Sequence, residues 1–344
     1  QNNKLVHFNI LVCAKNEEER IYQCLSSLNS INYPKDKYDI ILVNDNSNDN
    51  TIKVGLSFFK EFNITNYKIV NRKRKDGFVA GVLNDGIKEC NLEKKSFFGI
   101  IDADCTISKD ILKIVNDHIN ADNLDGLQVQ EWHTTSDNII NSAQHILCIY
   151  ENYNNFQDKI FKVGHFFSNK IAKKVVYNEN SILEDALFSE ECNNLDFKIK
   201  VIKDVLLFRK FSSNIFKVYS QQYRYQLGTV FNDSIKKKFM DNMLIPLLIL
   251  FAIIFDRNLL VNIIILLLLE IFGNIYYYYP TYYQLAKNNL PLIHKKTFEE
   301  QKYVIFNPIN IVGTIIFILS IVIIRLITFI RQMFNIEQVK LNRF

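Results

Sequence analysis

SFFGIIDAD, residues 96–104, runs five apolar residues straight into a pair of aspartates. A short apolar run that ends in polar residues predicts a buried β-strand, with Asp102 at its carboxyl end. Asp102 and Asp104 are two positions apart, so an extended backbone turns both carboxylates the same way. This stretch therefore predicts a buried strand that delivers two negative charges to one edge of a sheet.

Strand-like and helix-like stretches alternate on both sides of this strand. Upstream lie HFNILVCA, EEERIYQCLSSL, YDIILVND and YKIVN, and downstream lies SKDILKIVNDHI. This order predicts an α/β fold, a mostly parallel sheet with helices on its faces. In such sheets ligands bind beyond the carboxyl ends of the strands. The polar residues that follow each strand are therefore the candidates for a functional site.

The remaining elements follow the same pattern. In the first helix, residues 17–28, Glu17–Glu19 are expected in the opening turn, where the helix dipole favours acidic side chains. Predicted strands lie at 126–132 and 197–208, and predicted helices at 138–158 and 183–192. These elements form a second block after the first 120 residues.

Charge and cysteine usage exclude several classes of protein. The formal net charge is +5, but the Lys residues are scattered rather than gathered on one face, so no nucleic acid partner is expected. The six cysteines show no CxxC pair, which predicts reduced, mostly buried thiols in a cytosol-facing domain. No signal peptide is visible, and the chain starts at Gln1 rather than Met, which leaves room for an earlier natural start or a leading membrane span.

The longest apolar runs lie in the last third of the chain. Residues 1–238 alternate charged and apolar blocks, which predicts a soluble domain that ends in an interface helix, whereas 239–344 predict a transmembrane region. The candidate spans are 239–255, 258–279 and 304–330. The alternative, a buried apolar hairpin of a soluble protein, is disfavoured by runs such as IIILLLL and IIFILSIVII.

Flanking charges predict the orientation in the lipid bilayer. The triplet Lys236–Lys238 predicts an integral membrane protein whose soluble domain faces the cytoplasm, by the positive-inside rule. Three spans would place Arg331, Lys340 and Arg343 on the other side, against the same rule. Either one span lies in the membrane interface or a segment is missing, and both alternatives stay open.

Asp45 and the Asp102, Asp104 pair are candidate ligand-binding carboxylates. Asp45 ends the second predicted strand, in a loop that can present a carboxylate as hydrogen-bond acceptor, although a helix-capping turn explains the same residues equally well. Asp102 and Asp104 can share a hard divalent cation, which in turn neutralises a pyrophosphate. A solvated turn into the next helix is the alternative, but the abrupt change from buried run to DAD favours the metal site.

Two further patterns each have an ordinary and a functional interpretation. Glu184 and Asp185 open a predicted helix, where they either complement the helix dipole or hold a general base beside a pocket. In QQYRYQLG, Gln221, Arg224 and Tyr225 share one helical face. Arginine can clamp a phosphate and an aromatic ring can stack on a sugar, but an ordinary juxtamembrane helix has the same pattern.

Taken in order, LVCAKNEEE, VNDNS, RKRKDGFVAGVLNDGI, IDADC, SILEDA and QQYRYQLG resemble the motifs of the family 2 glycosyltransferases. They look most like the membrane-integrated synthases of the cellulose, mannan and hyaluronan type, and the resemblance covers about residues 7–230. It implies a GT-A catalytic domain, with a Rossmann-like, mostly parallel sheet, followed by transmembrane helices. It also implies a hexosyltransferase that adds sugar from a nucleoside diphosphate sugar, a UDP- or GDP-sugar, to a growing β-linked glycan with inversion.

The resemblance implies a role for each residue that matches a family motif. Asp45 matches the aspartate that contacts the nucleotide base. Asp102 and Asp104 match the DxD pair that binds Mg²⁺ or Mn²⁺ at the donor diphosphate, and Asp185 matches the catalytic base that deprotonates the acceptor hydroxyl. The substrate-binding set includes Gln221, Gln222, Arg224 and Tyr225 of the motif that closes the site, together with Glu184.

The chain departs from the family pattern at three places. Val79 stands where the family has a lysine that contacts the diphosphate, so Arg74 or Lys75 would have to supply that charge. Tyr225 replaces the usual tryptophan and offers the acceptor sugar a smaller platform. The segment expected to line the acceptor site, residues 163–170, reads VGHFFSNK and matches poorly, and its His165 is expected to be structural.

Two rival functions remain. One is a transferase that adds a single sugar to a polyprenyl phosphate or another lipid-linked acceptor, which would share the DxD pair. The other is a degenerate subunit that regulates a synthase, which would make partner subunits part of the function. The intact Asp45, Asp102, Asp104 and Asp185 disfavour the second rival.

Overall fold

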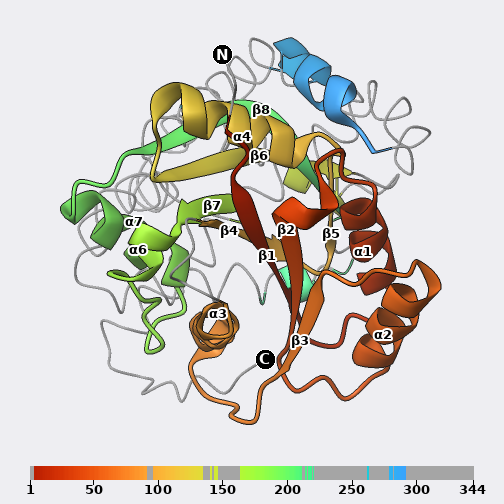
Figure 1. Ribbon diagram of the computed structural model, residues 1–344. Coiled ribbons are helices and arrows are strands. Elements are labelled where there is room, and N and C mark those ends of the chain that lie inside the picture. Colours follow the sequence, from red (N-terminus) through yellow and green to blue (C-terminus); the bar gives the residue numbers. More distant parts are fainter. Residues whose placement is uncertain are drawn as a thin grey trace. The chain divides into compact units, whose positions relative to one another are not determined.

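A computed structural model of the protein describes residues 4–90, 96–134, 140–141, 143–145, 163–210, 214, 216–218, 220, 262, 279–281 and 283–291. The chain divides into two compact units. The first unit consists of Gln1–Thr134, Asn152–Lys210 and Tyr282–Phe298, and contains all the labelled strands and helices of Figure 1. In the second unit, Ala143 and Val218 form a small apolar cluster.

One sheet forms the centre of the first unit. In the described residues its strand order is β3-β2-β1-β4-β7-β6-β8-β5 (Figure 1). The strands are β1 (His7–Ala14), β2 (Tyr38–Asn44), β3 (Tyr67–Asn71), β4 (Ser96–Asp102), β5 (Cys105–Ile107), β6 (Gly126–Thr134), β7 (His165–Ser168) and β8 (Ile199–Lys210). The helices are α1 (Ile21–Asn29), α2 (Thr51–Glu61), α3 (Phe78–Lys88), α4 (Ile111–Asp122), α6 (Asn169–Ala172) and α7 (Glu184–Asn194), with a 3₁₀ turn at Lys35–Lys37.

The expectation of a mostly parallel sheet is right for the half that contains β1 to β4, whereas the other half is mixed: β6 and β8 are parallel, but β7 and β5 are not. Strands β3, β2, β1 and β4 are all parallel, but β7 runs antiparallel to both β4 and β6, and β5 antiparallel to β8. Parallel neighbours need a crossover segment, and the sequence shows such helices between β1, β2, β3 and β4. Strand β7 reaches β4 from a distant part of the chain, so local alternation does not encode its direction.

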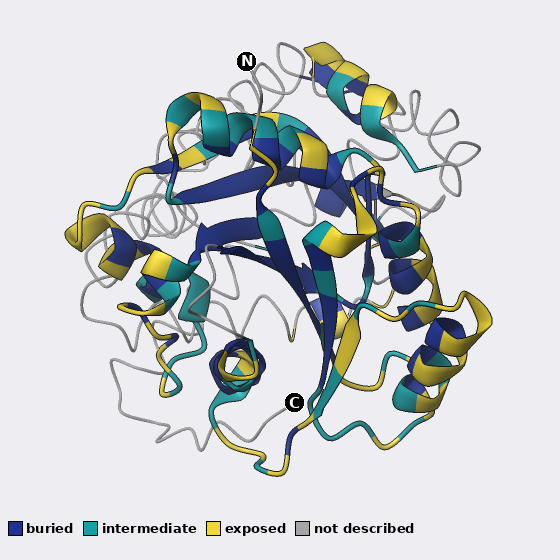
Figure 2. Ribbon diagram, viewed as in Figure 1, coloured by how far each residue is buried: buried dark blue, intermediate teal, exposed yellow. Residues whose placement is uncertain are grey.

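Two layers of helices cover the sheet, because side chains alternate along each strand. Phe8, Ile10 and Val12 of β1 pack with α1, α2 and α4, whereas Leu11 packs with α3, α6 and α7. Figure 2 shows the strands mostly buried, apart from the exposed edge strand β3, and the helices exposed mainly on their outer faces. The sequence prediction of helices on both faces is therefore confirmed.

An aromatic cluster packs β7 against the parallel half of the sheet. The Phe8 ring lies 5.6 Å from the Tyr33 ring and 5.9 Å from the Phe166 ring, both edge to face. Gly99 of β4 makes room for Phe166, since a Cβ at this position would stand 2.6 Å from the Phe166 ring. The glycine in SFFGIIDAD thus permits the close approach of an antiparallel strand.

Helix α1 begins at Ile21, so the prediction that Glu17–Glu19 form its opening turn is wrong. The Glu17 carbonyl accepts hydrogen bonds from the amides of Arg20 and Ile21, at 3.0 and 2.8 Å. The Glu17 amide donates to Thr51 Oγ1 at 2.8 Å, at the start of α2. Glu17–Glu19 therefore lie in a loop, which is hydrogen-bonded to the start of α2.

The other expected elements divide between described and undescribed residues. Strand β8 and helix α7 lie close to their predicted ranges, and residues 140–141 and 143–145 are helical within the predicted helix 138–158. No helix among the described residues combines the length and apolarity needed to cross a bilayer. The predicted spans 239–255, 258–279 and 304–330 lie almost wholly outside the described residues and stay predictions. All cysteines in the described part are free thiols.

Removing the Phe8 ring should destabilise the first unit. Phe8→Ala empties a fully buried site between two sheet halves and should lower the free energy of unfolding by about 3–5 kcal/mol. Denaturant unfolding followed by fluorescence of Trp132, the single tryptophan and a buried one, measures the change. Phe216→Ala is the control: that ring is 78% exposed and its loss should cost about 0.5 kcal/mol or less. Equal effects of both substitutions would contradict the packing role.

Candidate functional site

The ends of three parallel strands meet at one edge of the sheet. In register, Cys13 of β1 lies beside Asp102 of β4, and Ala14 beside Asn44 of β2. The Asp45 amide donates to the Ala14 carbonyl at 2.9 Å, and the Ala103 amide donates to the Cys13 carbonyl at 3.2 Å. Both predicted loops are thus attached to the end of β1.

Cys13 lies near the end of β1, in register with Asp102 of β4. Its side chain packs on the layer that contains α3 and α7. Burial raises the pKa of the Cys13 thiol, and the charges of Asp102, Asp45 and Asp185 raise it further, in that order. Asp102 is the register neighbour of Cys13, Asp45 is attached to the next residue of β1, and Asp185 begins a helix of the same core layer.

The Asp102, Asp104 pair lies in the turn between β4 and β5, with arginines on two sides. Asp102 Oδ2 accepts a hydrogen bond from Arg209 Nη2 at 2.5 Å. Asp104 Oδ1 is 3.6 Å from Arg209 Nε, and Asp104 Oδ2 is 3.5 Å from Arg20 Nη1. Burial raises the pKa of the Asp102 carboxyl, and the Arg209 charge opposes that shift.

This turn fits an open site for Mg²⁺ or Mn²⁺. The side chains of Asp102 and Asp104 are 36% and 22% exposed, so both carboxylates remain accessible. In the described part of the chain, no three Asp, Glu, His or Cys side chains form a closed metal cluster. Protein sites for Mg²⁺ commonly supply one or two carboxylates and leave the other positions to water and substrate phosphates. The two aspartates could hold a cation in this way.

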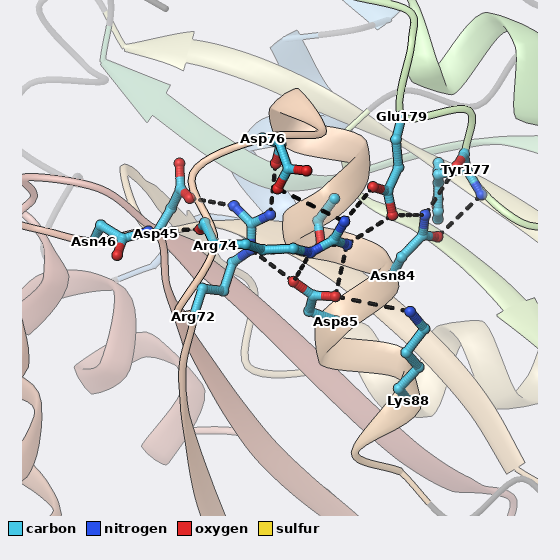
Figure 3. Close-up of polar contacts among 11 residues, drawn as sticks. Asp45, Asn46, Arg72, Arg74, Asp76, Asn84, Asp85, Lys88, Tyr177 and Glu179 are labelled. Atoms are coloured by element: carbon cyan, nitrogen blue, oxygen red, sulfur yellow. Dashed lines mark hydrogen bonds and ion pairs between the residues drawn. The ribbon is translucent and has the colours of Figure 1, made fainter.

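Asp45 is held by a buried arginine that the sequence analysis did not identify. Arg72, whose side chain is fully buried, donates from Nη1 to Asp45 Oδ1, from Nε to Asp85 Oδ2 at 2.9 Å and from Nη2 to the Asp76 carbonyl at 2.8 Å (Figure 3). Lys15 Nζ lies 3.5 Å from the other Asp45 oxygen. The position of the Asp45 carboxylate is thus set by a strand end, a helix and a loop together.

Arg74, predicted to contact a donor diphosphate, already has two carboxylate partners. Its guanidinium donates to Glu179 at 2.5 and 2.8 Å and to Asp85 at 2.7 and 2.9 Å (Figure 3). The hydrogen bonds from Glu179 and then Asp85 raise the pKa of Arg74 above its ordinary value. Lys75, the other predicted residue, lies exposed on the same loop.

The carboxylate partners of this loop are also missing from the sequence prediction. Burial acts to raise the pKa of Asp85, but hydrogen bonds from Arg74 and Arg72 hold it below its ordinary value. Asn84 Nδ2 donates to Glu179 Oε1 and to the Tyr177 carbonyl, both at 2.9 Å. Arg72 and Arg74 are two residues apart directly after β3. This spacing is the sequence signal that could have predicted a cluster of ion pairs with carboxylates.

Glu184 and Asp185 occupy the first turn of α7, as predicted, and both are partly buried. Next to them Tyr177 stacks on Phe188, with ring centroids 4.1 Å apart. Burial raises the pKa of Tyr177, and the Asp185 charge is the next cause. The fully buried His165 places Nε2 2.5 Å from the Tyr177 hydroxyl, which fits the structural role expected for this histidine.

Two residues of the site lie in the loop between β1 and α1. Burial raises the pKa of the Glu17 carboxyl to about 7, against the opposing charge of Arg20, whose Nε is 2.6 Å from Glu17 Oε2. Asp104 also raises this pKa.

One predicted motif lies outside the described residues, so the roles of its members stay predictions: Gln221, Gln222, Arg224 and Tyr225.

Two protein-family models match the chain. The model for Glycosyl transferase family 2 matches residues 9–176, and the model for Glycosyl transferase family group 2 matches residues 97–323. The second match alone covers more than half of the 344 residues and extends into the predicted membrane region.

Several relatives are similar over part of the chain. A beta-monoglucosyldiacylglycerol synthase from Synechocystis sp. is 29% identical over 123 residues, which are 36% of this chain and 25% of that protein. A dolichyl N-acetyl-alpha-D-glucosaminyl phosphate 3-beta-D-2,3-diacetamido-2,3-dideoxy-beta-D-glucuronosyltransferase from Methanococcus voltae is 35% identical over 105 residues, 30% and 31% of the two chains. A poly-beta-1,6-N-acetyl-D-glucosamine synthase from Staphylococcus epidermidis is 35% identical over 100 residues, 29% and 22%. The matched part thus spans less than a third of each relative's length.

Solved structures show a shared fold. A mannosyltransferase from Pyrobaculum calidifontis, in complex with GDP-Man and Mn²⁺, superposes with a TM-score of 0.58 at 12% identity, over 96% of this chain and 88% of that one. TarS from S. aureus, in complex with UDP-GlcNAc, has a TM-score of 0.48 at 18% identity, over 66% and 68%. The first likeness confirms the predicted GT-A type of α/β domain, whereas the transmembrane helices stay a prediction.

Removing the Arg72 guanidinium should destabilise the first unit and disorder Asp45. Arg72→Met leaves two carboxylates without their buried partner, which should cost about 3 kcal/mol of unfolding free energy. Denaturant unfolding followed by Trp132 fluorescence measures the loss. Lys73→Met, one residue along and exposed, is the matched control and should change little. If the two variants were equally stable, Arg72 would not hold the loop.

Glu17 should make stability depend on pH. The folded protein keeps a proton on Glu17 up to about pH 7, whereas the unfolded chain loses it near 4.5, so stability falls as the pH rises between these values. Glu17→Gln removes this loss. The variant should therefore gain stability over the parent at pH 8 compared with pH 5, and this gain should be on the order of 1–3 kcal/mol of unfolding free energy. Unfolding is measured at both pH values in EDTA, with the exposed Glu19→Gln as control. A stability difference between Glu17→Gln and the parent that did not change with pH would contradict the assignment.

Proposed function

The chain belongs to glycosyl transferase family group 2, and we propose that it is a membrane-bound inverting hexosyltransferase that extends a β-linked glycan from a nucleoside diphosphate sugar. The observation that carries the proposal is the placement of Asp45 and Asp102 at the end of β1, with Asp185 in the first turn of α7, a helix that packs in the same core layer as Cys13. These three residues come from separate motifs, and the family resemblance gives them three complementary roles. Asp45 and Asp102 lie at the carboxyl ends of parallel strands, and this edge of an α/β sheet is where ligands usually bind.

On the donor side, Asp45 would accept a hydrogen bond from the nucleotide base, and Asp102 and Asp104 would hold the cation. A bound Mg²⁺ or Mn²⁺ would neutralise the negative charge of the diphosphate leaving group. Arg74 is engaged by Asp85 and Glu179, so the exposed Lys75 is the better candidate to supply the charge that Val79 lacks. The P. calidifontis relative was solved with GDP-Man and Mn²⁺, which supports a nucleotide-sugar donor and a divalent cation.

On the acceptor side, Asp185 would act as general base. Its carboxylate would take the proton of the acceptor hydroxyl while that oxygen bonds to the anomeric carbon. The bond from this carbon to the diphosphate breaks on the opposite face, so an α-linked donor yields a β-linkage. The first turn of α7 and the stacked Tyr177–Phe188 pair would hold the base rigidly. Glu184 and the motif residues Gln221, Gln222, Arg224 and Tyr225 would line the acceptor side.

The acceptor is either a growing glycan or a lipid. QQYRYQLG resembles the motif of polymer-making synthases and favours the glycan, as does the named activity of the S. epidermidis relative. The second candidate, transfer of one sugar to a lipid-linked acceptor, is supported by relatives named for diacylglycerol and dolichyl phosphate acceptors. Either product would leave near a bilayer, in keeping with the predicted spans and a catalytic domain that faces the cytoplasm.

The activity test uses the full chain in liposomes with Mg²⁺ or Mn²⁺ and a panel of UDP- and GDP-sugars. We expect metal-dependent release of nucleoside diphosphate from one donor, because the Asp102, Asp104 pair needs a cation to bind the diphosphate. Mass spectrometry of the product separates a ladder of chain lengths from a single addition. Binding of a donor without any release would favour a regulatory subunit instead.

Asp185→Asn should lower transfer by about 100- to 10,000-fold while donor affinity stays within a few-fold, because a general base acts only in the transition state. Glu191→Gln, an exposed position on the same helix, is the matched control and should retain activity. Turnover of Asp185→Asn close to that of the parent would refute the role of Asp185.

A further inference from the structure

Arg209, a residue that none of the predicted motifs contains, reaches the Asp102, Asp104 turn from the end of β8. Its register neighbours are Cys105 on β5 and His133 on β6. The guanidinium donates from Nη2 to Asp102 Oδ2 at 2.5 Å and from Nε to Cys105 Sγ at 3.3 Å. Its Nε also lies 3.6 Å from Asp104 Oδ1. One cation from a distant strand therefore contacts both carboxylates of the pair.

The environment keeps this guanidinium in place. The Arg209 side chain is only 15% exposed, and Glu131 Oε2 stands 3.9 Å from Nε as a further negative group. Arg20, on the other side of Asp104, is 50% exposed and is held mainly by Glu17 at 2.6 Å. A guanidinium remains protonated at any pH at which the protein folds. Arg209 is thus a fixed positive charge, whereas Arg20 can turn towards solvent.

We propose that Arg209 is a positioning residue that serves as the resident counter-ion of the Asp102, Asp104 pair and makes cation binding depend on the diphosphate. The proposal rests on the proposed function of this pair as the cation site. Arg209 donates to Asp102 and lies near Asp104, so a cation that binds the pair has to compete with the guanidinium for both carboxylates. The protein alone should therefore bind a divalent cation weakly.

Electrostatics set the direction of this effect. A divalent cation on the aspartates would lie within a few ångströms of the guanidinium, and two positive charges at that range repel each other. The negative diphosphate of a bound nucleotide would attract both charges and offset the repulsion. By linkage, a nucleotide that tightens cation binding is itself bound more tightly in the presence of the cation. Removing the guanidinium should strengthen cation binding to the bare protein and weaken this coupling.

The test measures Mn²⁺ binding by electron paramagnetic resonance on the full chain in detergent, without nucleotide and with saturating UDP or GDP. Arg209→Gln should bind Mn²⁺ at least tenfold more tightly than the parent without nucleotide, and nucleotide should tighten binding less. Arg209→Lys keeps the charge and should stay within about threefold of the parent. Lys210→Gln, an exposed charge one residue along, is the control and should match the parent.

The outcomes separate this inference from the function on which it rests. If Arg209→Gln binds Mn²⁺ as the parent does, or more weakly, the counter-ion role is wrong. If no protein binds Mn²⁺ even with UDP or GDP, the proposed cation site itself is wrong. If Arg209→Gln folds only when Mn²⁺ is present, the result supports the proposal, because the cation then supplies the positive charge that the substitution removed. Failure to fold at every Mn²⁺ concentration would overturn it and make Arg209 a purely structural residue.

Discussion

Two backbone hydrogen bonds at the end of β1 bring the site together. The carbonyl of Ala14 receives the amide of Asp45, and the carbonyl of Cys13 receives the amide of Ala103. Because β1 lies between β2 and β4 in the sheet, the loops that follow these two strands both meet its end. The bonds satisfy backbone groups at the strand ends and fix the loops at the same time. Every other feature of the site builds on this juxtaposition.

Carboxylates that gather at one edge of the sheet repel each other, and arginines balance their negative charge. Asp45 is paired with the buried Arg72, and Asp102 with Arg209. Burial raises the pKa of the Asp102 carboxyl, and the charge of Arg209 opposes that shift. The arginines come from β8 and from the loop after β3, so the charge balance joins distant parts of the chain.

Under the proposed function, the same balance bears on Val79, which stands where the family motif has a lysine. The family lysine at this position would be a free positive charge, whereas Arg74 on the neighbouring loop is neutralised by Asp85 and Glu179. The charge of Arg74 is therefore balanced, and Lys73 and Lys75 are the exposed cations of this loop. Under the proposed function, donor binding should therefore depend more on a cation held by Asp102 and Asp104 than on this loop.

The sequence by itself determined the local elements and the carboxylates at their ends. Strand β4 ends at Asp102, Asp45 follows β2, and Asp185 lies in the first turn of α7, because apolar runs and their polar ends are local signals. Only the tertiary structure decided the antiparallel direction of β7 and the partners Arg72 and Arg209. Pairing across a sheet brings together residues that are far apart in sequence, and an arginine in a strand looks the same whether it faces water or a carboxylate. The start of α1 was missed for a related reason: the amide of Glu17 bonds to Thr51, a contact between loops that no helical periodicity records.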